Sequence, residues 1–252
     1  MISFPHAKVN LGLHIISRRD DGYHNLETCF YPVPEVCDAL EMIESESDSL
    51  VISGMEWQEP VQQNLVWKAM DLFRTLEPDL PPMAWQLLKK IPAGGGLGGG
   101  SSNAAFALRM MAGFCNWPKA DPRLFAMALK LGSDCPFFLE DGPRIAMGRG
   151  EVFTPIKLDL SLYRFEFVFP GIHVSTADAF ARITPREPKL SIENILQMPA
   201  SNWRSLLTND FEEAVFRLHP ELAMQKESLY ERGAVYASMS GSGSTLFGIF
   251  ER

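Results

Sequence analysis

Cysteine is scarce in this 252-residue chain, and acidic residues outnumber basic ones. The four cysteines (Cys29, Cys37, Cys115 and Cys135) show neither C-x-x-C nor Cys/His spacing, which argues against a metal site or a disulfide scaffold. We therefore expect reduced thiols in a cytoplasmic protein. The formal net charge of −8 and the lack of basic clusters argue against broad binding to nucleic acid or anionic membranes.

Long apolar runs are also lacking, so no segment approaches the length that crosses a bilayer. A strand-like pattern begins so close to Met1 that we expect no signal or transit peptide. The apolar content of 46% is typical of a globular protein, and the length allows two modest domains or one large one. The sequence changes in character near residue 155, and its strands and helices are grouped rather than strictly alternating. We therefore predict two α+β domains, residues 1–155 and 156–252.

Glycine is abundant in one place, where six of the seven residues 94–100 are glycine. A Walker A loop is excluded because no Gly-Lys-Ser/Thr follows. A dinucleotide fingerprint fits Gly94, Gly96 and Gly99, but the acidic residue expected about 20 positions later is missing. A flexible linker would continue into polar sequence, whereas an Ala-rich apolar segment follows. A kinase phosphate loop of a non-Walker type is favoured.

The residues after these glycines predict how the loop ends. Ser101, Ser102 and Asn103 are residue types that cap helix N-termini, and they precede a helix expected over residues 104–112. Bare backbone amides and a helix N-terminus together form a site for an anion, most commonly a phosphate.

Three other features are ambiguous when taken alone. Lys8 and Asn10 lie two residues apart in a predicted strand and so share a face, but such a lysine is more often a solubilising charge. Asp134 is a lone carboxylate among apolar residues, either a helix cap or a functional group. Gly241 and Gly243 either line a phosphate or close a tight hairpin.

Hydrophobic periodicity and cap residues predict the remaining elements. Strands are expected at residues 9–16, within 40–52, and at 83–91, 145–153 (interrupted at 148–150), 162–169, 234–239 and 245–250. Helices are expected from Asn64 to about 76, from Asp121 to 131, from Ser175 onward, and at 203–218 and 221–232.

Three blocks together resemble the motifs of the GHMP kinases, the superfamily of galactokinase, homoserine kinase and mevalonate kinase. They are residues 8–11 (Lys-Val-Asn-Leu), residues 92–105 around the glycine run, and residues 241–243 (Gly-Ser-Gly). Residues 19–26, 131–138 and 209–212 further resemble the members that phosphorylate a cytidine diphosphate derivative of methylerythritol, in the non-mevalonate pathway to isoprenoids. The resemblance spans nearly the whole chain.

The resemblance implies an α+β fold with an N-terminal half like ribosomal S5 domain 2, a ferredoxin-like C-terminal half, and the active site in the cleft between them. It implies transfer of the γ-phosphoryl group of ATP, with Mg²⁺, to the 2-hydroxyl of that small-molecule substrate. The residue matching the catalytic acid is Asp134, with Lys8 as its partner. The positions implied to bind ATP are Asn64 and Lys89 near the adenosine, and Pro92, Ala93, Gly94, Gly95, Gly96, Leu97, Gly98, Gly99, Gly100, Ser101 and Ser102 around the phosphates. Those implied to bind the substrate are Asn10, Tyr23, His24, Thr176, Phe180, Gly241 and Gly243, with aromatic rings sandwiching the cytosine.

Other functions stay open on the sequence alone. A homoserine or mevalonate kinase would share the glycine loops but has no use for aromatic residues that hold cytosine. A nucleotide sensor without catalysis would need neither Lys8 nor Asp134. A dehydrogenase is a more distant alternative, which binding of NAD would test.

Overall fold

The glycine loop and the first two long strands each contribute to both of the units into which the chain divides. The computed structural model describes all residues from 1 to 252. Unit 1 consists of Met1–Lys8, Val33–Ala93 and Gly98–Asp141, and unit 2 of Val9–Pro32, Gly94–Leu97 and Gly142–Arg252. The domain boundary predicted between residues 155 and 156 lies inside unit 2, and it stays a prediction.

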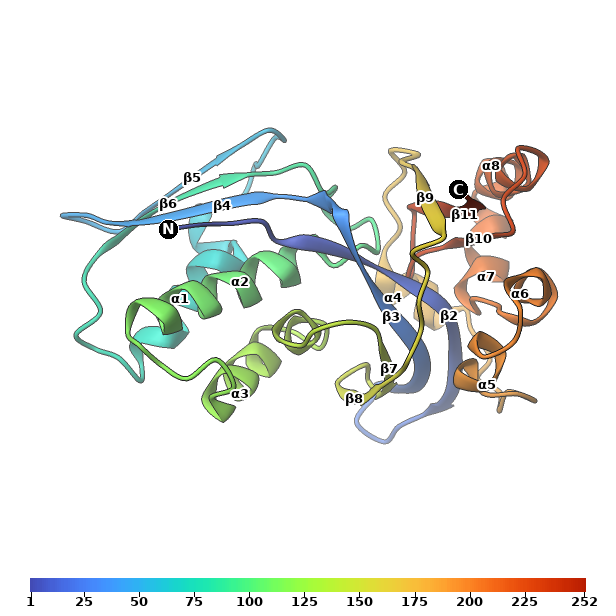
Figure 1. The fold of residues 1–252 in the computed structure, drawn as a ribbon, viewed down its shortest axis with the longest axis horizontal. Coiled ribbons are helices and arrows are strands. Elements are labelled where there is room, and N and C mark those ends of the chain that lie inside the picture. The colour runs from blue at the N-terminus through green and yellow to red at the C-terminus, as the bar shows by residue number, and fades with distance from the viewer. The chain divides into compact units, whose positions relative to one another are not determined.

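Unit 1 is a four-stranded sheet with helices packed against it (Figure 1). The strand order is β1-β4-β6-β5, in which β6 is antiparallel to β4 and parallel to β5. The strands are β1 (Ile2–Ser3), β4 (Ala39–Glu44), β5 (Ser49–Ser53) and β6 (Met83–Leu88), and the helices are η1 (Val61–Gln63), α1 (Leu65–Arg74), α2 (Gly99–Phe114), α3 (Pro122–Leu131) and η2 (Cys135–Leu139).

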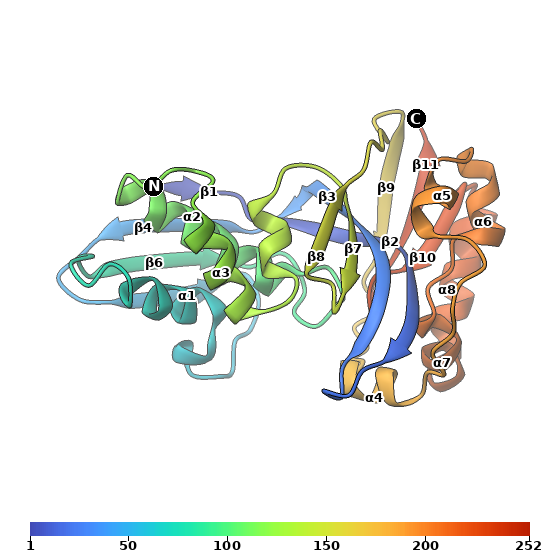
Figure 2. The same cartoon turned by 90° about the horizontal axis from the view of Figure 1, so that it is seen from below.

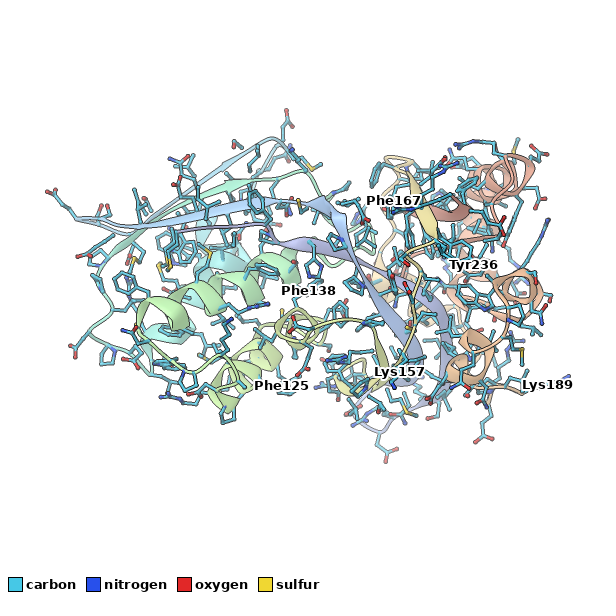
Figure 3. All side chains as sticks on the ribbon, viewed as in Figure 1. Phe125, Phe138, Lys157, Phe167, Lys189 and Tyr236 are labelled. Atoms are coloured by element: carbon cyan, nitrogen blue, oxygen red, sulfur yellow. The ribbon has the colours of Figure 1, made fainter.

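The core of unit 1 lies between this sheet and α1, α2 and α3. Alternate residues of β6, including Trp85 and Leu87, face the helices, and Phe73 of α1 is fully buried among them. Phe138 of η2 lies beside α2 (Figure 3). Burial of this apolar surface fixes α2 against the sheet, which in turn fixes the start of α2 where the glycine loop ends.

Unit 2 contains two further sheets (Figure 2). Their strand orders are β2-β3-β7-β8 and β10-β11-β9. None of the helices in the chain is long and apolar enough to span a bilayer. The strands are β2 (His6–Arg18), β3 (His24–Cys37), β7 (Arg144–Gly148), β8 (Val152–Pro155), β9 (Tyr163–Val168), β10 (Tyr236–Met239) and β11 (Leu246–Glu251). The helices are α4 (Thr176–Ala181), α5 (Ile192–Leu196), η3 (Ala200–Asn202), α6 (Trp203–Leu206), α7 (Phe211–Leu218) and α8 (Pro220–Glu231).

The three-stranded sheet carries the apolar core of unit 2. Apolar residues of α7 and α8, among them Phe211 and Leu222, pack against those of β10 and β11. Tyr236 of β10 and Phe167 of β9 (both labelled in Figure 3) lie on the strands that flank β11. The hairpin of β10 and β11 holds the second glycine loop at its turn.

Most predicted elements are confirmed, with Asn64, Asp121 and Ser175 as the N-caps of α1, α3 and α4. The predicted start of the central helix is wrong. Helix α2 begins at Gly99, its N-cap is Gly98 in the left-handed region, and the three residues 101–103 lie inside its first turns. Only glycine reaches that conformation at little cost, so a glycine ends the loop.

Two other predictions need correction. The helix expected over residues 203–218 is two helices, α6 and α7, because residues 207–210 leave the helical path to pair with β2. The long strand β3, which contains Pro32 and Pro34, was not predicted. Both prolines lie beyond the residues of β3 that pair with β7, where a missing N–H costs no hydrogen bond of that ladder.

Candidate functional site

The glycine loop needs its glycines for space as well as for conformation. Gly94, Gly96 and Gly98 have φ of 69°, 78° and 69°, in the region that side chains disfavour. A Cβ on Gly96 would lie 1.9 Å from the carbonyl oxygen of Ser240. A Cβ on Gly98 would lie 2.9 Å from Phe138 and 3.2 Å from Cε of Lys8. The loop backbone is therefore packed against its neighbours, as a site for a ligand held by main-chain amides requires.

Within unit 2, the two glycine loops contact each other. The Ser240 hydroxyl donates to the Gly96 carbonyl over 2.8 Å, and the Thr245 amide donates to the Gly95 carbonyl over 3.3 Å. Gly241 also lies against Gly96, since a Cβ on it would be 3.5 Å from Gly96 Cα. The structure thus brings Gly241 to the first glycine loop, which favours a role in the site over hairpin closure alone.

Lys8 and Asp134 meet in unit 1. Lys8 Nζ lies 3.3 Å from Asp134 Oδ2, with the lysine side chain 4% exposed and the aspartate 33% exposed. A buried cation is thus paired with a carboxylate that still reaches solvent. Because Lys8 Cε also borders Gly98, this ion pair lies at the end of the glycine loop where α2 begins.

Asn10 is buried in unit 2 and its amide is oriented by neighbours. Its Nδ2 donates to the Thr28 hydroxyl over 2.9 Å, and Thr28 in turn donates to the Gly12 carbonyl over 2.6 Å. The Ser240 hydroxyl accepts from the Asn10 backbone amide over 3.3 Å. Asn10 is therefore linked to the same serine that contacts the glycine loop.

Of the residues predicted to hold cytosine, His24 and Phe180 stack on each other in unit 2, and Tyr23 contacts Arg149 instead. The rings of His24 and Phe180 lie 5.0 Å apart and nearly parallel, while the Arg149 guanidinium lies 4.8 Å from the centroid of Tyr23. Burial, and to a lesser extent Arg18, lowers the pKa of His24, so its imidazole stays neutral at lower pH than usual. His24 covers one face of Phe180, so a base stacking on that face requires the His24 ring to move.

Thr176, also predicted to bind the substrate, is exposed at the start of α4. Its hydroxyl lies 2.9 Å from that of Ser242, the residue between Gly241 and Gly243. The second glycine loop and α4 are thereby in contact within unit 2.

The two residues predicted near the adenosine are both engaged in unit 1. Asn64 Oδ1 accepts from the Val66 amide over 2.9 Å as the N-cap of α1. Lys89 is only 7% exposed, and its Nζ donates to Asp38. The adenosine contact of both residues stays a prediction.

Substituting Asn64 separates its capping role from a contact with nucleotide. We expect Asn64→Ala to lower the free energy of unfolding by about 0.5–2 kcal/mol, because the cap is lost. Asn64→Asp keeps the capping oxygen and removes the amide NH₂, so it should keep that stability. Both variants should raise KM for ATP by roughly twofold to tenfold, as loss of one hydrogen bond does. Chemical unfolding and steady-state kinetics measure both effects, and a normal KM in Asn64→Asp would leave Asn64 as a cap only.

Sequence reasoning missed Asp38, Thr28, Ser240 and Arg149. Each acts on a predicted site residue through a contact between segments far apart in the sequence, 51 residues for Asp38 with Lys89 and 230 for Ser240 with Asn10. No short motif carries such a contact. The signal that was available is Asp38 itself, a charged residue just before the strands predicted within residues 40–52.

Two family models match the chain. One, described as the N-terminal domain of the GHMP kinases, matches residues 64–142, and one described as GHMP kinases C-terminal matches residues 190–252. The first match contains the glycine loop and Asp134, and the second contains the second glycine loop.

Relatives match over the whole chain. The 4-diphosphocytidyl-2-C-methyl-D-erythritol kinase of Parabacteroides distasonis is 46% identical over 252 residues, covering 100% of this chain and 92% of the relative. The enzyme of that name from Bacteroides thetaiotaomicron is 47% identical over 255 residues, with the same coverage.

Solved structures agree on the fold. A crystal structure of 4-(cytidine 5'-diphospho)-2C-methyl-D-erythritol kinase superimposes with a TM-score of 0.83 at 36% identity, covering 99% of this chain and 90% of that one. The mevalonate kinase of Methanococcus jannaschii has a TM-score of 0.68 at 14% identity, covering 100% of this chain and 90% of that one, and shows the shared fold alone.

Proposed function

We propose a role for each site residue of this chain. The chain belongs to the GHMP kinase family. It phosphorylates 4-diphosphocytidyl-2-C-methyl-D-erythritol with ATP in the non-mevalonate pathway. The predicted family, two-domain fold and kinase activity are confirmed by these relatives. The observation that carries the residue assignments is the Lys8 and Asp134 ion pair, 3.3 Å long, at the end of the glycine loop. The four cysteines of the chain are free thiols, which supports the proposal that the protein works in the cytoplasm.

Asp134 and Lys8 are proposed to act on the acceptor hydroxyl. The oxygen of the substrate 2-hydroxyl bonds to the γ-phosphorus, and the Asp134 carboxylate accepts the proton of that hydroxyl. The bond from the γ-phosphorus to the β,γ-bridging oxygen breaks, which releases ADP. The ammonium of Lys8 offsets negative charge beside the transferring group. Since phosphoryl transfer depends mostly on positioning and charge neutralisation, a carboxylate paired with a lysine suffices.

Residues 92–102 are proposed to hold the ATP phosphates through backbone amides and the N-terminus of α2. Mg²⁺ usually takes only one or two protein oxygens beside those of the phosphates, and it neutralises phosphate charge when bound. The partly exposed Ser101 hydroxyl of unit 1 has that chemistry and would hold it. Ser102 Oγ is buried without a hydrogen-bond partner in the structure, so it is suited to donate to a phosphate oxygen.

The substrate is proposed to bind to unit 2, its cytosine through Tyr23, His24, Phe180 and Thr176. The neutral His24 imidazole offers one donor and one acceptor, which suits the polar edge of cytosine. Asn10 and the second glycine loop, Gly241 and Gly243, are proposed to contact its phosphates. Gly241 and Gly243 have φ of 56° and 93°, in the region that again favours glycine.

Removing the Phe180 ring tests the cytosine site. We expect Phe180→Ala to raise KM for the cytidylyl substrate by roughly tenfold to a hundredfold, since stacking on one base contributes about 1–3 kcal/mol. KM for ATP should stay unchanged. Phe169→Ala is the matched control, because Phe169 is 49% exposed beside β9. A normal substrate KM in Phe180→Ala, with folding verified by circular dichroism, would contradict the site.

The specificity of the reaction is tested by measuring ATP consumption with magnesium and four acceptors. Turnover is expected with 4-diphosphocytidyl-2-C-methyl-D-erythritol and not with mevalonate, homoserine or galactose. Binding of ATP without turnover on any acceptor would indicate a nucleotide sensor. Turnover on another acceptor would keep the phosphate chemistry and discard the cytosine site.

A further inference from the structure

Asp38 lies in the link between β3 and β4, and the residue is 1% exposed. It accepts hydrogen bonds from the backbone amides of Lys90 and Ile91 over 2.6 and 2.9 Å. It also accepts from Lys89 Nζ, and from Asn103 Nδ2 over 2.8 Å. One buried carboxylate thus joins the chain just before the glycine loop to the first turns of α2 just after it.

Lys89 and Asn103 complete a closed cluster around this carboxylate. Lys89 Nζ donates to Asn103 Oδ1 over 3.1 Å in addition to its bond with Asp38. Burial lowers the pKa of Lys89, while the Asp38 carboxylate opposes that change by favouring the ammonium form. The side chains of Asp38, Lys89 and Asn103 therefore bond one another, and the backbone amides of Lys90 and Ile91 complete the partners of the carboxylate.

The start of α2 packs directly on this cluster. A Cβ on Gly99, the first residue of α2, would lie 3.2 Å from Lys89 Nζ and 3.0 Å from Ile91 Cβ. A side chain at residue 99 would therefore press on Lys89 and Ile91, so the helix N-terminus packs closely on both. The Asp38 carboxylate thus bonds to the chain at both ends of the glycine loop. This fixes the distance between the two ends.

We infer that Asp38 is a positioning residue for nucleotide binding, which holds the phosphate loop at both ends through Lys89 and Asn103. The inference rests on the proposed binding of the ATP phosphates by this loop. It gives Lys89 a different role from a direct contact with adenosine, because its ammonium is directed at Asp38 and Asn103. A buried ion pair is a weak source of stability compared with apolar residues of similar size, so a geometric role accounts better for its place here.

A second carboxylate of unit 1, that of Asp48, provides the control, and its side chain is partly buried at 24% exposure. Asp48 accepts hydrogen bonds from Arg74 and, over 2.8 Å, from the backbone amide of Met83. Met83 is the first residue of β6, whereas Lys89 follows its last residue. Asp38→Asn and Asp48→Asn thus remove the same charge from similar networks at opposite ends of one strand.

The experiment measures binding of AMP-PNP by calorimetry and unfolding by denaturant for both variants. Asp38→Asn should weaken AMP-PNP binding by about tenfold or more, as expected when charge-assisted hydrogen bonds are lost. Asp48→Asn should change it by less than about twofold, although it also loses stability. Equal weakening in both variants, or none in Asp38→Asn, would overturn the inference. Asn103→Ala, which keeps both charges, replaces Asp38→Asn if that variant does not fold, and about threefold weakening is then expected.

Lys89→Met separates positioning from direct contact. Positioning predicts that KM for ATP and KM for GTP increase by the same factor. It also predicts that KM for ATP in the double variant Asp38→Asn, Lys89→Met is no higher than in the more severe single variant. A changed preference between ATP and GTP, or additive losses, would overturn the inference and assign Lys89 to the base. AMP-PNP binding needs no acceptor, so failure of the proposed function would appear separately, as missing turnover in the unmodified chain.

Discussion

Asp134→Asn should lower kcat by about a hundredfold to ten-thousandfold, the range that general acid or base catalysis contributes. Asparagine keeps the size and one hydrogen-bond acceptor of the carboxylate but cannot take the proton of the 2-hydroxyl. KM for ATP and for the cytidylyl substrate should change little, because both ligands are bound mainly by other residues. Steady-state kinetics with coupled detection of ADP measures these constants.

The control for this prediction is Asp79→Asn, which removes the same charge from an exposed position of unit 1. It should leave kcat within about twofold, since exposed charges contribute little. Lys8→Met should lower kcat as well, because it leaves the Asp134 carboxylate without the cation 3.3 Å away. A loss below about tenfold in Asp134→Asn would contradict proton transfer to Asp134 and leave it the task of orienting the hydroxyl.

The elements that were predicted correctly are those whose cause is local in the sequence. Asp121 caps α3 by accepting from the amide of Arg123, two residues on, and Gly132 ends the same helix. Such contacts are set by adjacent residues, so their residue types identify them. The glycine loop stands out in the sequence for the same reason, because bare backbone is a property of glycine alone, and its binding of phosphate stays a prediction.

The start of α2 was mispredicted because its cap is one glycine within a run of glycines. Gly98 takes the left-handed conformation and Gly99 opens the helix, yet the sequence distinguishes neither from its neighbours. Ser101 and Ser102, which look like caps, are instead in the first turns. The helix amides at residues 99 and 100 then need no side-chain cap if a phosphate binds them.

The parts of the site that could not be predicted are contacts between distant segments. Asp38 bonds the amides of Lys90 and Ile91, and Ser240 bonds Asn10 and Gly96, through packing of whole sheets and helices. Their residue types, one aspartate and one serine, are common and carry no motif. The sequence therefore identifies groups suited to bind a ligand more readily than the groups that hold them in place.

Gly96→Ala should abolish most activity, with kcat/KM for ATP lower by about a hundredfold or more. An alanine at φ of 78° costs roughly 1–3 kcal/mol in backbone strain. Its Cβ would also lie 1.9 Å from the Ser240 carbonyl oxygen, so one of the two glycine loops must move. Displacing either loop removes main-chain amides from the proposed phosphate site, and stability should decrease as well.

Gly113→Ala provides the comparison within the same segment of chain. Gly113 lies near the end of α2, is exposed, and a Cβ on it would meet nothing within 4 Å. Alanine there should raise the free energy of unfolding by about 0.4–1 kcal/mol by restricting the unfolded chain, with kinetics unchanged. If Gly96→Ala kept kcat/KM for ATP within about threefold of the unmodified chain, the contact with Ser240 would not constrain the loop, and phosphate binding by this backbone would have to be abandoned.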